Sequence, residues 1–234
     1  MKKVISFSLY GNNPMYTLGA LCNAELSEII FPGWVCRFYY GDSVPNDIIE
    51  RLSEYSNVEL IHMVEDGNHN YMTWRFLSID DDDVEIMISR DADSRLSFRE
   101  KKLVDIFINS DFNFHDIRDC HLHNDVMGGT WGMKKNNKVN MKELLTISQT
   151  NTGYGHDQYF LREFISPKFV NDSLLHNSEY NPTHGNYLNT FPIRFEEILS
   201  PLINPVHNPM SMYHYIGEVF PGDNYNKPLN HIFY

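Results

Sequence analysis

Two carboxylates lie close together in the segment 88–95, which reads ISRDADSR. Asp91 and Asp93 are separated only by the small residue Ala92, and they follow an apolar, β-branched run that is typical of a buried strand. The chain turns where such a strand ends, so both carboxylates can converge on one point. Hard cations such as Mg²⁺ and Mn²⁺ bind carboxylate oxygens and keep positions open for phosphate oxygens. The pattern predicts a metal site at Asp91 and Asp93 that acts as a Lewis acid on a diphosphate, although an isolated Asp-x-Asp pair often marks only a solvated turn.

Arginines near these carboxylates are candidates for anion binding. Arg90 and Arg95 can pair bidentately with phosphate oxygens, or they can balance the aspartates through surface salt bridges. Arg75 stands between two large aromatic residues, and it either reaches a ligand cleft or lies along the surface of a helix. The four consecutive aspartates at 80–83 follow no strand, so they are interpreted as a solvated turn.

Later segments add candidates of a different kind. Gly128 and Gly129 are adjacent, and paired glycines let a backbone approach a ligand closely. His121 and His123 are interpreted as polar loop residues and not as metal ligands. Asp157 stands at the predicted start of a helix, where it is either an N-cap or a carboxylate that faces an acceptor hydroxyl. In a reaction that inverts an anomeric centre, Asp157 is the first candidate for the general base.

Composition narrows the class of protein. A chain of 234 residues that is 42% hydrophobic can bury one substantial core, so we expect a single domain. A net charge of −12 argues against nucleic-acid binding, and an anionic diphosphate would need a local cation. The 3 cysteines are widely spaced without a CxxC pair, which fits a reducing compartment. No apolar run approaches the roughly 20 residues of a membrane helix, and the apolar N-terminal run is interpreted as a strand, not a signal peptide.

Alternating strands and helices must position these residues. Hydrophobic patterning predicts strands at 4–9, 34–40, 58–63, 84–89 and 114–118, and helices at 16–30, 44–55, 71–77, 98–108, 140–147 and 157–165. Such an order predicts an α/β fold with a mostly parallel central sheet flanked by helices. Asp91 and Asp93 then lie at the carboxyl end of a central strand, where ligands bind in open α/β sheets. From residue 167 onward we expect loops that wrap the domain.

Four segments, taken in order, resemble small GT-A glycosyltransferases. They are WRFL at 74–77, VEIMISRDADSRLSFRE at 84–100, GGTWG at 128–132 and DQYFL at 157–161. Proteins of this kind occur in bacterial surface-polysaccharide clusters and in large DNA viruses that glycosylate their own capsid protein. The resemblance spans about 4–172, with an echo at 216–219. It implies a GT-A, Rossmann-like domain over 1–234, with a nucleotide-binding half at 1–95 and an acceptor half and wrapping tail at 96–234.

The resemblance also implies ligands and roles. The donor would be a UDP- or GDP-linked sugar, the cofactor Mn²⁺ or Mg²⁺, and the acceptor a glycan or glycoprotein. Asp91 and Asp93 match the metal-binding Asp-x-Asp. The implied nucleotide-sugar contacts are Ser8, Tyr10 and Gly11 at the end of the first strand, Arg75 at the diphosphate, Arg90 and Ala92 beside the metal, and Gly128 and Gly129 near the donor sugar. Relatives often carry His-Asp-Ser where this chain has NDS at 171–173, and His176 is the nearest substitute for that histidine as a metal ligand.

We therefore expect transfer of a hexose-type sugar to a hydroxyl group, in the cytoplasm of a bacterium or of a virus-infected host cell. One alternative is a sugar-nucleotide nucleotidyltransferase, although the loop YGNNP at 10–14 lacks the Lys or Arg of a phosphate-binding loop. Another is a catalytically silent glycan-binding module, which the intact pair of Asp91 and Asp93 disfavours. The sequence leaves open whether the reaction inverts or retains the anomeric centre.

Overall fold

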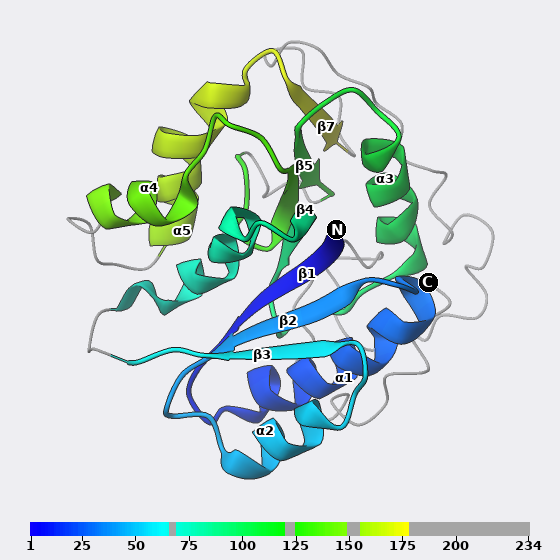
Figure 1. The fold of residues 1–234 in the computed structure, drawn as a ribbon, viewed down its shortest axis with the longest axis vertical. Coiled ribbons are helices and arrows are strands. Elements are labelled where there is room, and N and C mark those ends of the chain that lie inside the picture. Colours follow the sequence, from blue (N-terminus) through cyan, green and yellow to red (C-terminus); the bar gives the residue numbers. More distant parts are fainter. Residues whose placement is uncertain (66–68, 120–124, 149–154, 178–234) are drawn as a thin grey trace, which may run out of the picture.

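The computed structural model describes residues 1–65, 69–119, 125–148 and 155–177 of the chain (Figure 1). Within these residues the strands are β1 (Lys2–Leu9), β2 (Val35–Tyr40), β3 (Val58–His62), β4 (Val84–Arg90), β5 (Phe114–Arg118), β6 (Thr130–Lys134) and β7 (Ser173–Asn177). The α-helices are α1 (Pro14–Ile30), α2 (Asn46–Ser53), α3 (Phe98–Ile108), α4 (Met141–Ser148) and α5 (His156–Phe160). A 3₁₀ segment, η1 (His69–Asp80), precedes β4, and the π-helical turn η2 (Leu161–Ile165) and the 3₁₀ turn η3 (Ser166–Phe169) follow α5.

The strands of the described residues form one sheet in the order β3-β2-β1-β4-β6-β5-β7. β1 pairs in parallel with β2 and β4, and β2 pairs in parallel with β3. β6 runs antiparallel between β4 and β5, and β7 pairs in parallel with β5, so six of the seven strands share one direction. The expected α/β fold with a mostly parallel sheet is confirmed.

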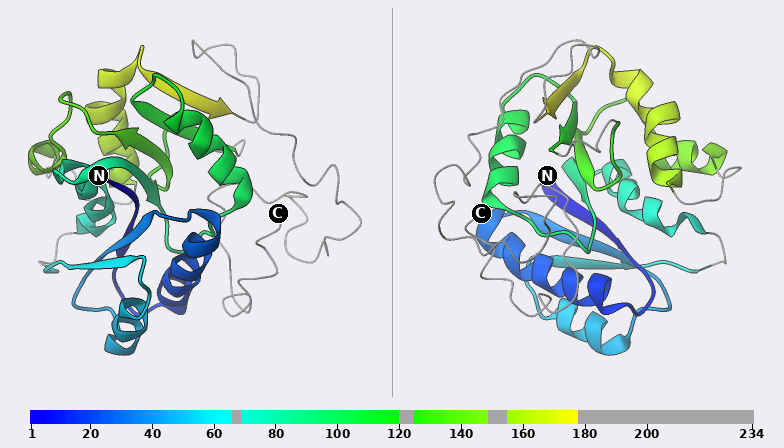
Figure 2. Two further views of the ribbon diagram at one scale, coloured as in Figure 1. Left: turned by 45° about the vertical axis from the view of Figure 1, so that its right-hand side comes forward. Right: turned by 180° about the vertical axis from the view of Figure 1, so that it is seen from behind.

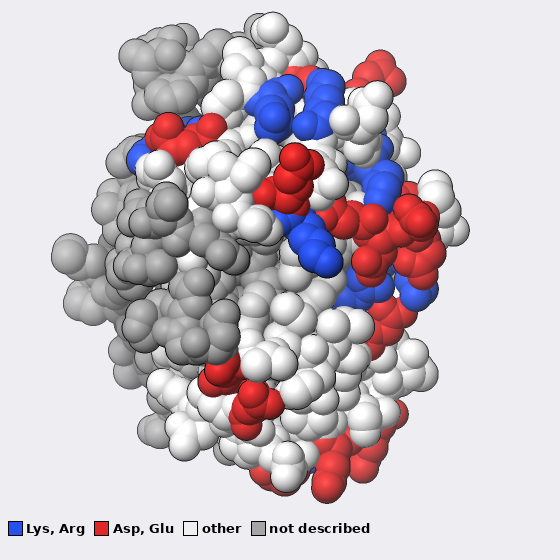
Figure 3. All heavy atoms as spheres, turned by 60° about the vertical axis from the view of Figure 1, so that its left-hand side comes forward, with Lys and Arg blue, Asp and Glu red and all other residues white. Residues whose placement is uncertain are grey.

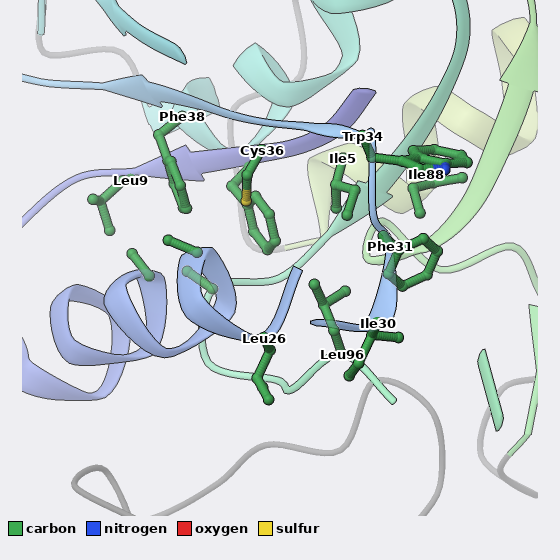
Figure 4. Packing of buried hydrophobic residues seen from close by; sticks show 14 of the residues in the cluster. Ile5, Leu9, Leu26, Ile30, Phe31, Trp34, Cys36, Phe38, Ile88 and Leu96 are labelled. Atoms are coloured by element: carbon green, nitrogen blue, oxygen red, sulfur yellow. The ribbon is translucent and has the colours of Figure 1, made fainter. Parts of the chain in front are cut away.

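Helices cover both faces of the sheet, as the two views of Figure 2 show. On one face, α1, α2 and α3 pack against strand residues such as Ile5, Phe38 and Ile88 (Figure 4). On the other face, η1, α4 and the helices after residue 155 pack against a second cluster that includes Met87 and Trp131. Successive residues of β4 therefore point to opposite faces, and the strand is buried on both.

The structure corrects several sequence-based expectations. β6 and β7 were not predicted as strands, and β7 shows that the tail does not begin as a wrapping loop at residue 167. The segment predicted as a helix at 71–77 is part of the 3₁₀ segment η1, and the helix expected at 157–165 changes from α to π after Phe160. No helix of the described part of the chain is long and apolar enough to cross a membrane.

The acidic turn at 80–83 is also more than a solvated turn. The Asp80 carboxylate accepts hydrogen bonds from the backbone N–H groups of Met141 and Lys142, at 2.8 and 2.7 Å, at the start of α4. Asp81 pairs with Arg37, which is buried within β2. Figure 3 shows that basic side chains stand beside acidic ones on one face of the molecule. The turn therefore ties together segments that are far apart in the sequence.

Candidate active site

Asp91 and Asp93 follow directly after β4, at the carboxyl edge of the sheet. The Asp91 side chain is 40% exposed, whereas Asp93 is 8% exposed. Burial and the neighbouring charge of Asp91 raise the pKa of Asp93 to about 6. The two carboxylates repel each other at this partly open strand end, and a bound cation would relieve that repulsion.

The turn that carries these carboxylates is fixed by Asn23 of α1, a residue that sequence reasoning missed. The Asn23 side chain is 1% exposed. Its amide nitrogen donates to the carbonyl of Ser94 at 2.9 Å, and its oxygen accepts from the N–H of Leu96 at 3.1 Å. The signal was present, because an asparagine within an apolar helical stripe must find hydrogen-bond partners in the core.

Arg75 lies at the centre of the site and bridges two carboxylates. Its guanidinium forms ion pairs with Asp91 and with Asp157, the latter at 2.9 Å. Burial alone would lower the pKa of Arg75, but the charges of Asp91 and Asp157 raise it overall. The backbone N–H of Arg75 donates to Ser8 Oγ at 3.0 Å, which fastens η1 to the end of β1. The fold thus brings together Ser8 of β1, Arg75 of η1, Asp91 just after β4 and Asp157 of α5. We call Arg75, Asp91, Asp93 and Asp157 the acidic cluster.

Gly128 and Gly129 lie against this cluster, just before β6. A Cβ atom on Gly128 would stand 2.5 Å from Arg75 Nη2 and 2.8 Å from Asp157 Cγ, and one on Gly129 would overlap the Asp91 carboxylate. The Gly128 carbonyl also accepts a hydrogen bond from Ser89 Oγ at 2.7 Å. The glycines are therefore required for the close approach of the backbone to these side chains.

Tyr10 and Gly11 lie at the carboxyl end of β1, beside the cluster. The Tyr10 ring makes edge contacts with Tyr71 and Trp74, at centroid distances of 5.5 and 6.3 Å. Burial raises the pKa of the Tyr10 hydroxyl, Arg75 lowers it, and the nearby carboxylates raise it further. Gly11 has a φ of 74°, which favours glycine, and its N–H donates to Ser43 Oγ at 2.6 Å.

Arg90 and Ala92 are more deeply buried than we expected for residues that contact a nucleotide sugar. Arg90 is 1% exposed, forms a buried ion pair with Glu100 of α3 and donates to the carbonyl of Trp131 at 3.1 Å. Contrary to the expectation of a phosphate contact, its guanidinium has almost no solvent-facing surface. Ala92 is 3% exposed, and its carbonyl accepts from Asn23 at 3.4 Å. Arg95 donates to the carbonyl of Ser94 at 2.8 Å.

His176 does not join Asp91 and Asp93. It is buried in β7, where its Nδ1 lies 2.8 Å from Nε2 of His115 on β5. Burial lowers the pKa of His176 to about 4. Among the residues that the structure describes, no group of three or more His, Cys, Asp or Glu side chains could hold a metal ion. The suggestion that His176 supplies a third ligand is therefore not supported. His121, His123 and the segment 216–219 lie outside the described residues.

Asp157 lies in the first turn of α5, but it does not cap that helix. The N-cap position is Gly155, which has a φ of 80°. The Asp157 side chain is 11% exposed, and its Oδ2 atom pairs with Arg75 while its Oδ1 atom accepts from the backbone N–H of Gln158 at 2.9 Å. Asp157 is therefore not the N-cap residue, but its carboxylate both bonds to the first turn of α5 and forms an ion pair inside the acidic cluster.

Comparison with known proteins gives remote matches. No family model and no curated protein matches the sequence. S. aureus TarS 1–349 is 12% identical with a TM-score of 0.49, over 76% of this chain and 59% of that one. A glycosyltransferase involved in glycosylation of the PBCV-1 major capsid is 17% identical with a TM-score of 0.48, over 76% and 82%. A putative glucose-1-phosphate thymidylyltransferase from Bacillus anthracis is 8% identical with a TM-score of 0.44, over 76% and 87%. The chain thus spans less than two thirds of TarS 1–349. Similarity at this level does not separate sugar transfer from nucleotidyl transfer, so function has to be inferred from the site.

Proposed function

We propose that this chain is a metal-dependent glycosyltransferase that moves a hexose-type sugar from a UDP- or GDP-sugar to a hydroxyl group of a glycan or glycoprotein. One observation carries the proposal: Asp91 and Asp93 lie at the carboxyl end of a central strand, and Arg75 pairs with both Asp91 and Asp157 there. In a chain of net charge −12, a diphosphate needs local positive charge to bind. A divalent cation on the two carboxylates supplies that charge next to Arg75.

The residues present fit Mg²⁺ or Mn²⁺. Asp91 and Asp93 offer hard oxygen donors, and burial together with the charge of Asp91 already disfavours the ionised form of Asp93 without a cation. Because two carboxylates do not fill the coordination sphere of either ion, positions remain for phosphate oxygens and water. The bound ion would stabilise charge on the leaving diphosphate as a Lewis acid.

The other residues of the site would orient these groups. Arg75 holds the Asp91 and Asp157 carboxylates in place and adds a positive charge beside them. If the reaction inverts the anomeric centre, Asp157 would accept the proton of the attacking hydroxyl. If the reaction retains configuration, no such base is required, and Asp157 would position Arg75.

A thermal-shift panel of UDP-, GDP-, TDP- and CMP-sugars, each with Mn²⁺ and with EDTA, tests the proposal. A ligand present at 100 times its Kd stabilises the native state by about 2.7 kcal/mol. We expect a UDP- or GDP-sugar to raise the Tm with Mn²⁺ and not with EDTA. Full-strength binding in EDTA would contradict the metal dependence. Incubation with a nucleoside triphosphate and a sugar 1-phosphate checks the alternative, since formation of a nucleotide sugar would identify a nucleotidyltransferase.

A further inference from the structure

A pocket of about 180 Å³ lies between η1, α4 and the start of α5, outside the acidic cluster. Asn70, Tyr71 and Trp74 line it from η1, Lys142 lines it from α4, and His156 lines it from α5. Pockets for drug-sized ligands usually measure about 300–1,000 Å³. The space is therefore too small for a nucleotide diphosphate and suits a ligand of the size of one ring.

One wall of the pocket is aromatic. The rings of Tyr71 and Trp74 are stacked, with a centroid distance of 4.7 Å and an interplanar angle of 29°. Tyr10 braces Trp74 by an edge contact. Flat aromatic surface with a few polar groups beside it is suited to a ligand that has one apolar face and several hydroxyl groups.

Two of the polar side chains that line the pocket, Asn70 and His156, have buried atoms without a hydrogen-bond partner among the described residues. Both the amide nitrogen and the amide oxygen of Asn70 are buried, and neither has a hydrogen-bond partner in the described part of the chain. The same holds for Nδ1 of His156, whose side chain is 3% exposed. Burial lowers the pKa of His156, so the ring is neutral near pH 7 and Nδ1 can donate or accept. Native proteins rarely leave buried polar atoms unpaired, so these atoms are suited to hydrogen bonds with the hydroxyl groups of a ligand.

The pocket adjoins the acidic cluster through the chain itself. Trp74 directly precedes Arg75, and His156 directly precedes Asp157. We infer that this pocket binds one pyranose ring of the acceptor, with its apolar face against Tyr71 and Trp74 and its hydroxyls toward Asn70 and His156. Binding of a saccharide follows from the pocket alone, whereas calling that saccharide the acceptor rests on the proposed function.

Saturation-transfer NMR with methyl pyranosides tests the inference. The probes are the methyl glycosides of glucose, galactose, mannose, rhamnose, N-acetylglucosamine and glucuronic acid, added in EDTA without nucleotide. We expect at least one to bind the wild-type chain, and Asn70→Leu to weaken its binding at least tenfold. We also expect Asn70→Leu to raise the Tm of the ligand-free protein, because unpaired buried polar atoms are replaced by methyl groups of similar shape. Asn171→Leu, at an exposed position, should change neither quantity.

Several outcomes would overturn the inference. They are the absence of binding by every glycoside, unchanged binding in Asn70→Leu, and a lowered Tm in that variant, which would give Asn70 a structural role. Displacement of the glycoside by uridine would assign the pocket to the donor. The same protein is then tested with UDP and Mn²⁺. Nucleotide binding without glycoside binding refutes only the pocket, whereas glycoside binding without metal-dependent nucleotide binding refutes only the proposed function.

Discussion

A single methyl group at Gly128 should disable the acidic cluster without unfolding the protein. In Gly128→Ala, the new Cβ would lie 2.5 Å from Arg75 Nη2 and 2.8 Å from Asp157 Cγ. Ordinary van der Waals contact begins near 3.4 Å. The new Cβ would also overlap Asp157 Oδ2, which is its nearest neighbour. The carboxylate must therefore move aside, and the guanidinium must retreat by about 0.9 Å, the difference between 2.5 and 3.4 Å, because the packed site has no room for an added methyl group.

A displacement of this size should strongly weaken ligand binding but have little effect on the stability of the fold. Misplacement of about 1 Å in a catalytic array can cost about 10²-fold in rate. We expect Gly128→Ala to weaken binding of UDP or GDP in Mn²⁺ at least tenfold, or about 1.4 kcal/mol. Gly129→Ala should cause a similar loss by pushing the Asp91 carboxylate aside.

Isothermal titration calorimetry measures the affinity, and thermal unfolding measures the stability. Gly132→Ala is the matched control. Its Cβ would stand 2.8 Å from Ile88 Cγ2 and from the Met87 carbonyl, inside the sheet and away from the cluster. Overpacking of this kind costs about 1–3 kcal/mol of stability. The control should therefore lower the Tm and leave the affinity of the folded protein unchanged.

The opposite pattern would refute the reasoning. If Gly128→Ala binds the nucleotide as tightly as wild type, Arg75 and Asp157 do not need their observed positions for binding. If Gly128→Ala unfolds while Gly132→Ala does not, the glycine serves the fold and not the site.

Three further predictions concern charged groups. Asp93→Asn should raise the Tm of the metal-free protein at pH 7, because burial and the charge of Asp91 raise the Asp93 pKa to about 6 and so disfavour its carboxylate in the folded state. Asp91→Asn should lower the Tm, because it removes a partner of Arg75. Both variants should abolish metal-dependent nucleotide binding in calorimetry. Asp157→Asn should keep donor affinity and lose on the order of 10²–10⁴ in turnover, and near-normal turnover with a retained anomeric linkage by NMR would show that no base is needed. Burial lowers the pKa of His176 from 6.5 to about 4, so its ring should stay neutral in NMR titrations down to about pH 5. Because the unfolded state binds the proton more readily, the contribution of His176 to stability should be full above pH 6.5 and fall by about 3 kcal/mol as the pH drops to about 4. Titration of His176 near pH 6.5 would contradict its burial.

Local patterning was sufficient to predict most of the helices and strands up to residue 118. The helix at 98–108 and the strand at 114–118 have the predicted bounds, and α1 begins two residues earlier than predicted because Asn13 caps it. These elements are long or bounded by clear turn residues, so their periodicity is unambiguous.

The missing strands were short and depended on distant partners. β6 has 5 residues that include Gly132, and it is defined by antiparallel pairing with β4, whose partner residues stand 40 to 48 positions earlier in the chain. β7 also has 5 residues and pairs with β5. No local signal specifies such pairing, because the strand forms only where a neighbouring edge is available.

The same limit applied to the site. The predicted strand was enough to place Asp91 and Asp93 at the carboxyl edge of the sheet. The contact of Arg75 with Asp157, in contrast, joins residues 82 positions apart. The acidic turn is exposed at 81–83 as expected, but its partners could not be predicted for the same reason, since those of Asp80 and Asp81 come from α4 and β2. Sequence reasoning selected charged residues that the structure brings together, and it could not assign their partners.

The charge of the acidic cluster explains why metal and nucleotide should bind together. Asp91, Asp93 and Asp157 carry three negative charges when ionised, and Arg75 supplies one positive charge, which leaves a net charge of −2. A diphosphate that approaches this cluster without a cation meets repulsion at close range, where screening by salt is weakest. A divalent cation would bring the cluster to neutrality, and Arg75 could then attract the phosphates. Nucleotide affinity should therefore depend on metal far more steeply than on the ionic strength of a monovalent salt, and equal effects of Mn²⁺ and of KCl at matched ionic strength would show that only general screening is involved.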